Sequence, residues 1–148
     1  MDKPCVLLVD DNDATCTLVT AVLQRDFTTE ICGDGNDALE KLKAGKYAAV
    51  VLDLRMPPPD GYEIMDAMLK SRPELLKRTI VVSAALSQRE SQRLKSYPVA
   101  DVIGKPFDVE MLLAAVKKCA GDDGMPFGNM LSSGMLLLIA EMLQRRWL

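Results

Sequence analysis

The sequence contains no histidine, few aromatic residues and no surplus of basic residues, and each absence excludes a class of function. Without histidine, no imidazole can act as a general base, and every zinc ligand set that contains histidine is excluded. The four cysteines are widely spaced and include no C-x-x-C pair, so they do not form a zinc site on their own. The net charge of −3 argues against direct nucleic-acid binding, which depends on neutralising phosphates.

Long apolar runs are also missing. One lysine precedes the first apolar stretch, which stops at two aspartates, so no secretory signal is expected. The apolar run at 135–140 is far too short to cross a bilayer. Cys5 and Cys32 lie in apolar runs and are expected to be small buried residues in a reducing compartment. These features predict a soluble, cytoplasmic protein with no membrane contact.

The sequence does contain short, uninterrupted apolar runs that alternate with helical patterns. Continuous apolar character favours parallel strands that are covered on both faces. The alternation predicts an α/β fold with a doubly wound, five-stranded parallel sheet flanked by five helices, which is the flavodoxin-like arrangement. The expected strands are 5–9, 27–32, 48–52, 79–83 and 99–103.

The helical patterns are apolar stripes with recognisable ends. The first stripe follows a cap at Asn12 or Asp13, the second ends at Gly45, and the third stops before Pro73. The segment 87–97 is almost wholly polar, so a helix there would be weakly docked, with its basic residues forming a solvated face. The last stripe ends before Gly121.

The character of the chain changes after Gly121. Residues 122–128 form a turn-rich linker, and 130–148 predict one extra C-terminal helix. The apolar stripe of that helix is broad enough to need cover from its own domain or from a partner chain. We therefore divide the chain into a domain at 1–121 and a linker with an apolar helix at 122–148.

Acidic, hydroxyl and lysine side chains stand at the carboxyl ends of the predicted strands. Asp10 and Asp11 follow the first strand, Asp53 follows the third, Ser83 ends the fourth, and Lys105 follows the fifth. Parallel strands bring these ends to one edge of the sheet. Clustered carboxylates repel one another, and oxygen ligands of this kind suit magnesium. With the lysine neutralising one phosphoryl oxygen and the serine hydroxyl donating a hydrogen bond to another, Asp53 would be the nucleophile that forms an aspartyl phosphate.

Each of these residues also has an ordinary structural explanation. The two aspartates after the first strand could merely cap the first helix, although Asn12 and Asp13 already serve that purpose. Taken alone, Asp53 could be a turn residue, Ser83 a strand-end hydroxyl and Lys105 a solvated surface lysine. The phosphoryl-transfer interpretation is favoured because all of these residues occur together, each at the carboxyl end of a predicted strand.

Four short motifs follow one another in order along residues 4 to 119. They are Asp10-Asp11, then Asp53 with Met56-Pro57 and Asp60-Gly61, then Ser83-Ala84, and finally Lys105-Pro106-Phe107. In order and spacing they resemble the receiver domain of response regulators in two-component signalling, of the chemotaxis-regulator-like kind. No single motif is specific, but the four together are.

The resemblance implies a set of magnesium ligands and a phosphoryl donor. Asp11 and Asp53 would ligate magnesium directly, Asp10 through water, and Arg55 through its backbone carbonyl. Asp53 would receive its phosphoryl group from a phosphohistidine on a sensor histidine kinase or a histidine phosphotransfer protein. Arg55 and Ala85 occupy positions that influence the lifetime of the phosphate in this family.

The resemblance also implies how the domain responds to phosphorylation. Ser83 and Lys105 would contact the phosphoryl group and draw their loops inward, and the Lys105–Pro106 bond would be cis. Small Ala84 would leave room for the phosphoryl group. Val102 occupies a switch position where the family often has tyrosine or phenylalanine, so switching would be transmitted by loop and helix movement instead.

These features predict a phosphorylation-controlled signalling switch rather than an enzyme that acts on other substrates. It would catalyse only its own phosphorylation and dephosphorylation and would signal by conformational change or by dimerisation. A homodimer would use the C-terminal helix or the face of the fourth helix, fifth strand and fifth helix.

Two alternative functions differ from this one in class. A magnesium phosphohydrolase of the haloacid-dehalogenase type needs a second aspartate two residues after the nucleophile, where this chain has Arg55. A receiver fold used as an interaction module, with output independent of phosphorylation, stays open. Too few residues follow Gly121 for a helix-turn-helix domain, and the sequence leaves open whether the chain is a stand-alone regulator or part of a longer protein.

Overall fold

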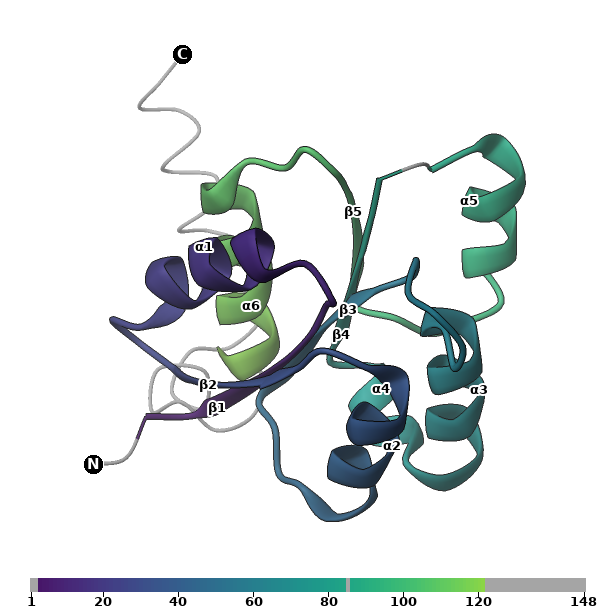
Figure 1. The fold of residues 1–148 in the computed structure, drawn as a ribbon, viewed down its shortest axis with the longest axis horizontal. Coiled ribbons are helices and arrows are strands. Elements are labelled where there is room, and N and C mark those ends of the chain that lie inside the picture. Colours follow the sequence, from purple (N-terminus) through teal and green to yellow (C-terminus); the bar gives the residue numbers. More distant parts are fainter. Residues whose placement is uncertain (1–2, 85, 122–148) are drawn as a thin grey trace, which may run out of the picture.

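The computed structural model describes residues 3–84 and 86–121. These residues form a parallel sheet with helices on both faces, in strand order β2-β1-β3-β4-β5 (Figure 1). The strands are β1 (Cys5–Val9), β2 (Thr28–Cys32), β3 (Ala49–Asp53), β4 (Thr79–Ser83) and β5 (Asp101–Gly104). The helices are α1 (Asp13–Leu23), α2 (Gly35–Ala44), α3 (Gly61–Ser71), α4 (Pro73–Leu76), α5 (Gln88–Leu94) and α6 (Val109–Gly121).

The predicted α/β fold with a five-stranded parallel sheet is confirmed. The described residues contain six helices rather than the five expected in the domain, because Pro73 starts the short helix α4 directly after α3. Proline suits the first turn of a helix, where its missing N–H group would have no partner. Strand β5 begins at Asp101, later than predicted, because the N–H group of Val99 is bonded to the carbonyl of Tyr97 in a turn.

Several other predictions have definite outcomes. The Asn12 side chain caps α1 by accepting a hydrogen bond from the N–H group of Thr15, and Gly45 follows the end of α2. Cys32 is fully buried as predicted, whereas Cys5 is partly exposed. Within residues 3–84 and 86–121, no helix has both the length and the apolar character needed to cross a membrane. The predicted linker and C-terminal helix at 122–148 lie outside the described residues, so the division at Gly121 stays a prediction.

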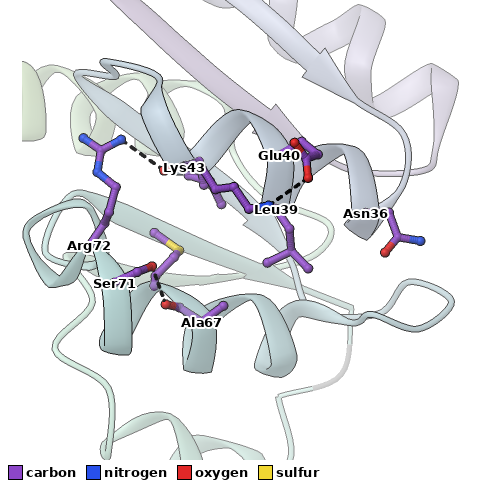
Figure 2. Close-up of a pocket in the computed structure, with 9 residues that line it drawn as sticks. Asn36, Leu39, Glu40, Lys43, Ala67, Ser71 and Arg72 are labelled. Atoms are coloured by element: carbon purple, nitrogen blue, oxygen red, sulfur yellow. Dashed lines mark hydrogen bonds and ion pairs between the residues drawn. The ribbon is translucent and has the colours of Figure 1, made fainter.

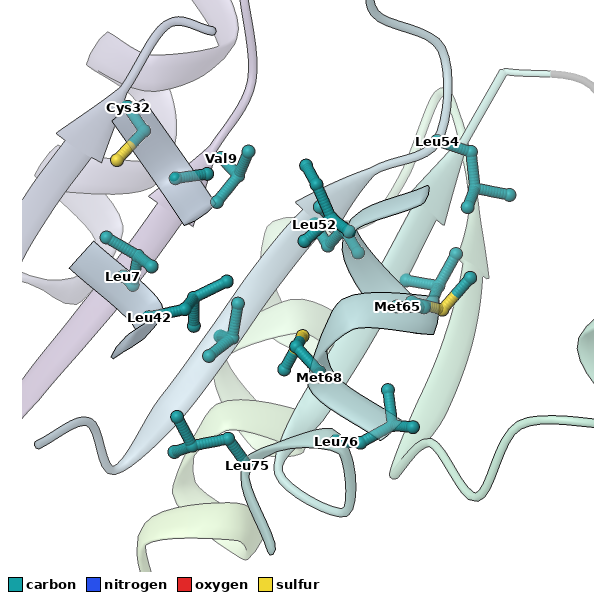
Figure 3. Packing of buried hydrophobic residues seen from close by; sticks show 14 of the residues in the cluster. Leu7, Val9, Cys32, Leu42, Leu52, Leu54, Met65, Met68, Leu75 and Leu76 are labelled. Carbon is teal, nitrogen blue, oxygen red and sulfur yellow. The ribbon is translucent and has the colours of Figure 1, made fainter. Parts of the chain in front are cut away.

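Apolar side chains fill the space on both faces of the sheet. Helices α1 and α6 cover one face, and α2 and α3 cover the other (Figure 1). Successive residues of β1 point to opposite faces, so Leu7 packs in the cluster that contains Leu52 and Met68 (Figure 3), while Leu8 packs toward α1 and α6. The central strands are therefore covered on both sides, which explains their continuous apolar sequences.

Helices α2 and α3 lie side by side over their face of the sheet and leave a groove of about 370 Å³ between them (Figure 2). Arg72, directly after α3, donates hydrogen bonds to the backbone carbonyls of Leu42 and Gly45 at 3.0 and 2.7 Å. On the rim, Lys43 and Glu40 form an exposed ion pair. Arg72 therefore ties the carboxyl-terminal ends of the two helices together.

Two glycines let the loop after β3 lie close to its neighbours. A Cβ atom on Gly61 would lie 2.6 Å from the Cα atom of Leu54 and 2.9 Å from the carbonyl oxygen of Asp53. A Cβ atom on Gly35, at the start of α2, would collide with the backbone of Pro59. Backbone atoms cannot move aside by changing rotamer, so both positions need glycine to hold the loop 54–60 in place.

Gly61→Ala should lower the free energy of unfolding by about 1–3 kcal/mol, because the new methyl group forces the β3–α3 loop to shift. Urea denaturation would measure this change. Gly33→Ala is the matched control, since a Cβ atom there meets nothing within 4 Å, and it should change stability by less than about 0.5 kcal/mol. Equal stabilities of the two variants would contradict the packing described for the loop.

Candidate functional site

The predicted site residues meet at the edge of the sheet formed by the carboxyl ends of the strands. Asp10 directly follows β1, Asp53 is the last residue of β3, and Lys105 directly follows β5. Strand β3 is the centre of the sheet, with β1 on one side and β4 on the other. This strand order places Asp53 in the middle of the edge, with the other residues around it.

Three carboxylates converge at this edge. Asp10, Asp11 and Asp53 each offer an oxygen, and these oxygens all lie within 4.8 Å of one another. Asp10 and Asp53 are only 3% and 6% exposed, whereas Asp11 is exposed. A small set of carboxylates with one side open to solvent fits magnesium, which binds few protein oxygens and keeps several waters. The cluster can therefore hold a magnesium ion.

Lys105 supplies the positive charge of the cluster. Its Nζ atom lies 3.0 Å from Asp10 Oδ2 and 3.5 Å from Asp53 Oδ2. Burial by itself would lower the pKa of Lys105, but the hydrogen bond to Asp10 and the charge of Asp53 outweigh burial and raise the pKa overall. The lysine is therefore a protonated cation at neutral pH. The Lys105–Pro106 peptide bond is cis, as predicted.

Ser83 is the last residue of β4 and is fully buried. Its backbone carbonyl accepts a hydrogen bond of 2.7 Å from the N–H group of Lys105. The hydroxyl oxygen has no hydrogen-bond partner within residues 3–84 and 86–121. A buried hydroxyl without a partner is uncommon. The Ser83 hydroxyl can therefore donate a hydrogen bond to a group that enters the site. Ala84, the next residue, is exposed.

Arg55 and Val102 take different positions relative to the carboxylates. The backbone N–H group of Arg55 donates to Asp53 Oδ1 at 3.1 Å, so the backbone of Arg55 lies beside the cluster. Val102 is a half-buried residue of β5 that packs with the hydrophobic cluster on the α2 and α3 side of the sheet. The predicted switch position is thus an aliphatic residue within the sheet.

Burial raises the pKa of Asp53 above its ordinary value of 3.8, and the charge of Asp10 raises it further. The hydrogen bond from Arg55 and the charge of Lys105 act in the opposite direction but do not cancel the effect. Since the folded pKa lies above the unfolded one, ionised Asp53 lowers stability at every pH above the folded value. Below the ordinary pKa, where the carboxyl group is neutral in both states, this loss disappears.

Asp53→Asn should therefore raise the free energy of unfolding at neutral pH, because the amide is neutral. The advantage should shrink as the pH falls through the raised pKa of Asp53. Urea denaturation across this pH range, without added metal, would measure it. Asp13→Asn changes an exposed carboxylate and should show no comparable pH-dependent gain. An equal gain in both variants would contradict the role of burial at Asp53.

The family model described as "Response regulator receiver domain" matches residues 6–117. The chain belongs to the response regulator receiver family. Receiver domains of this family act in phosphorylation-dependent two-component signalling.

Two curated relatives show the contexts in which such receiver domains occur. The regulatory protein VanRB of Enterococcus faecalis is 32% identical over 114 residues, which cover 76% of this chain and 50% of that protein. The aerobic respiration control sensor protein ArcB of Escherichia coli is 30% identical over 114 residues, covering 76% of this chain and 15% of that protein. The chain thus spans about half the length of VanRB and a smaller share of ArcB.

Solved structures show the same fold. The beryllofluoride-activated receiver domain of DrrB from Thermotoga maritima is 28% identical, with a TM-score of 0.70, covering 79% of this chain and 97% of that one. The receiver domain of a sensor histidine kinase from Pseudomonas aeruginosa, solved with magnesium in its active-site cleft, is 23% identical with a TM-score of 0.72. That match covers 80% of this chain and 98% of the Pseudomonas chain, and it supports the receiver fold.

The structure gives two residues of α5 contacts beside the site that the sequence did not predict. Glu90 of α5 pairs with the guanidinium of Arg55, and Arg93 stacks on the ring of Tyr62 instead of only facing solvent. The sequence offered one signal, since residues 90 and 93 are spaced to lie on the same side of a helix. It gave no indication that this side faces the loop after Asp53.

Proposed function

We propose that this receiver domain is a switch in which Asp53 accepts a phosphoryl group in a magnesium-dependent reaction. The observation that carries the proposal is the convergence of two further carboxylates, Asp10 and Asp11, and one lysine around Asp53 at the end of the central strand. In the reaction, the P–N bond of a phosphohistidine breaks and a P–O bond to an oxygen of Asp53 forms. The histidine nitrogen keeps the electron pair of the broken bond.

The resemblance to receiver domains suggests the magnesium ligands, and the closeness of the three carboxylates supports them. Asp11 and Asp53 would bind the ion directly, Asp10 would bind through water, and the carbonyl of Arg55 would be a further ligand. Bound magnesium would supply positive charge to a phosphoryl oxygen and relieve the repulsion among the carboxylates. The magnesium found in the Pseudomonas receiver domain supports this assignment.

Lys105 and Ser83 would act on the other phosphoryl oxygens. Lys105 already bridges Asp10 and Asp53, so its ammonium group can neutralise the negative charge that a phosphoryl group brings. The partnerless hydroxyl of Ser83 would donate a hydrogen bond to the phosphoryl group. Because Val102 stands where the family often has an aromatic residue, switching would be transmitted by loop and helix movement instead.

The donor would be a sensor histidine kinase or a histidine phosphotransfer protein. Matches to both a regulator and a sensor protein support a place in such a relay. The domain would catalyse its own phosphorylation and dephosphorylation and act on no other substrate. A homodimer would form through the face of the fourth predicted helix, fifth strand and fifth predicted helix, or through the C-terminal segment 122–148. In the structure, these two helices are α5 and α6.

Beryllofluoride, which imitates a phosphoryl group on a carboxylate, provides the test. Calorimetric titration of the whole chain should show binding of beryllofluoride when magnesium is present and no binding when magnesium is chelated. Asp53→Asn should abolish the binding. Binding that survives this substitution, or a wild-type protein that binds nothing, would overturn the proposed function.

A further inference from the structure

Two cationic side chains connect helix α5 to its neighbours, one to the loop after Asp53 and one to α3. The guanidinium of Arg55, in the loop, lies 3.5 Å from Glu90 Oε1. The guanidinium carbon of Arg93, on α5, lies 3.7 Å from the centre of the Tyr62 ring on α3. A hollow of about 550 Å³ lies between these elements and is lined by all four residues. At this place, side-chain ends rather than a packed interface connect α5 to the loop.

Helix α5 is held by few contacts. It has seven residues, of which Leu94 is buried, and its outer residues are polar. Just beyond the helix, the hydroxyl group of Tyr97 donates to Asp66 Oδ1 of α3 at 2.7 Å. A short helix with one buried anchor is the kind of element that shifts at low cost. Each polar contact between α5 and its neighbours therefore contributes substantially to holding the helix in place.

The ion pair with Arg55 leaves one oxygen of the Glu90 carboxylate without a partner in the described part of the chain. The other carboxylate oxygen of Glu90, Oε2, and the hydroxyl group of Tyr62 are both buried and have no hydrogen-bond partner among residues 3–84 and 86–121. Arg55 is the cation that pairs with Glu90 across this hollow. Removal of the guanidinium would leave a partly buried carboxylate without that partner, which disfavours the present position of α5.

Arg55 also lies next to the phosphorylation site. Its N–H group donates a hydrogen bond to Asp53 Oδ1, and its side chain is 60% exposed, so little packing opposes a change of rotamer. Phosphorylation would raise the negative charge at Asp53 from one to about two and add acceptor oxygens that match a guanidinium. The phosphoryl group and Glu90 would then compete for the same side chain.

We propose that Arg55 is a positioning residue that exchanges partners when Asp53 is phosphorylated. Without a phosphoryl group it pairs with Glu90 and holds α5 against the loop, and with a phosphoryl group it pairs with the phosphoryl oxygens and releases α5. This inference rests on the proposed function of Asp53. It gives α5 a link to the phosphorylation site that does not pass through Val102.

The first measurement uses the whole chain without metal or beryllofluoride. Glu90→Gln keeps the shape of the side chain and removes its charge. Amide hydrogen exchange in residues 88–97 should become about two- to fivefold faster, as the loss of an ion pair with one exposed partner implies. Glu63→Gln is the matched control, because it removes one exposed negative charge from the first turn of α3. It should leave exchange in 88–97 unchanged.

The second measurement is the affinity for beryllofluoride with magnesium. If the pair must break on activation, Glu90→Gln should tighten binding by a similar two- to fivefold factor, because the two equilibria are linked. In an Arg55→Gln background the same substitution should have no effect, as a double-mutant cycle would show. A purely electrostatic effect of Glu90 would instead persist in that background.

Unchanged exchange in Glu90→Gln, or equal effects of this substitution with and without Arg55, would overturn the partner exchange. A wild-type protein that does not bind beryllofluoride would overturn the proposed function instead. The exchange measurement in the metal-free protein would still test whether the ion pair holds α5. The two failures are therefore distinguishable.

Discussion

Lys105→Met should slow the phosphorylation of Asp53 by about 100-fold, which is the usual effect of removing one group that stabilises the transition state. The ammonium group of Lys105 lies within 3.5 Å of both Asp10 and Asp53, so it is placed to neutralise an oxygen of the incoming phosphoryl group. Methionine has a side chain of similar length without the charge. The rate of mass gain with a small phosphoryl donor and magnesium would measure the effect.

The same variant should bind magnesium more tightly than the wild-type protein, because the carboxylates of Asp10 and Asp53 lose a competing cation. A slower reaction together with tighter metal binding separates loss of the lysine from general damage to the site. Lys117→Met is the matched control, since Lys117 is an exposed residue of α6 that pairs with Asp26. A control as slow as Lys105→Met, or a normal rate for Lys105→Met, would contradict the role given to this lysine.

Asp11→Asn should lower the affinity for magnesium by about 10- to 100-fold. Loss of groups that only support a ligand already has effects of this size in metal sites, and Asp11 would be a direct ligand. Because Asp11 is exposed, the substitution should leave the stability of the fold nearly unchanged. Calorimetric titration with magnesium would give the affinity.

The comparison for Asp11 is Asp13→Asn, which removes a carboxylate two residues further along the chain, in the first turn of α1. It should lower the affinity far less, because Asp13 does not belong to the carboxylate cluster. Equal losses in the two variants would mean that net charge near the site, rather than ligation by Asp11, determines metal binding.

The sequence was sufficient to predict the carboxylate cluster because the argument needs only strand order and direction. Asp10, Asp53 and Lys105 follow runs of continuous apolar residues, and parallel strands bring their ends to one edge of the sheet. Their closeness therefore follows from a periodicity that is visible in the sequence. The ion pairs of Lys105 with Asp10 at 3.0 Å and with Asp53 at 3.5 Å follow from this arrangement of strands.

Features that depend on packing between distant segments could not be predicted in this way. Gly35 and Gly61 look like ordinary helix-start glycines, and only the structure shows that each faces the backbone of the β3–α3 loop. The pairing of Arg55 with Glu90 joins a loop to a helix about thirty-five residues away, with a hollow between them. Such contacts depend on how a short, weakly anchored helix lies, and sequence periodicity does not encode that position.

The central claim is that Asp53 carries the phosphoryl group, and the most direct measurement is the intact mass of the chain after incubation with acetyl phosphate and magnesium. We predict a gain of one phosphoryl group on the wild-type protein, peptide mapping of that group to Asp53, and no gain on Asp53→Asn or after chelation of magnesium. A phosphoryl group that maps to another residue, or that persists on Asp53→Asn, would contradict the account.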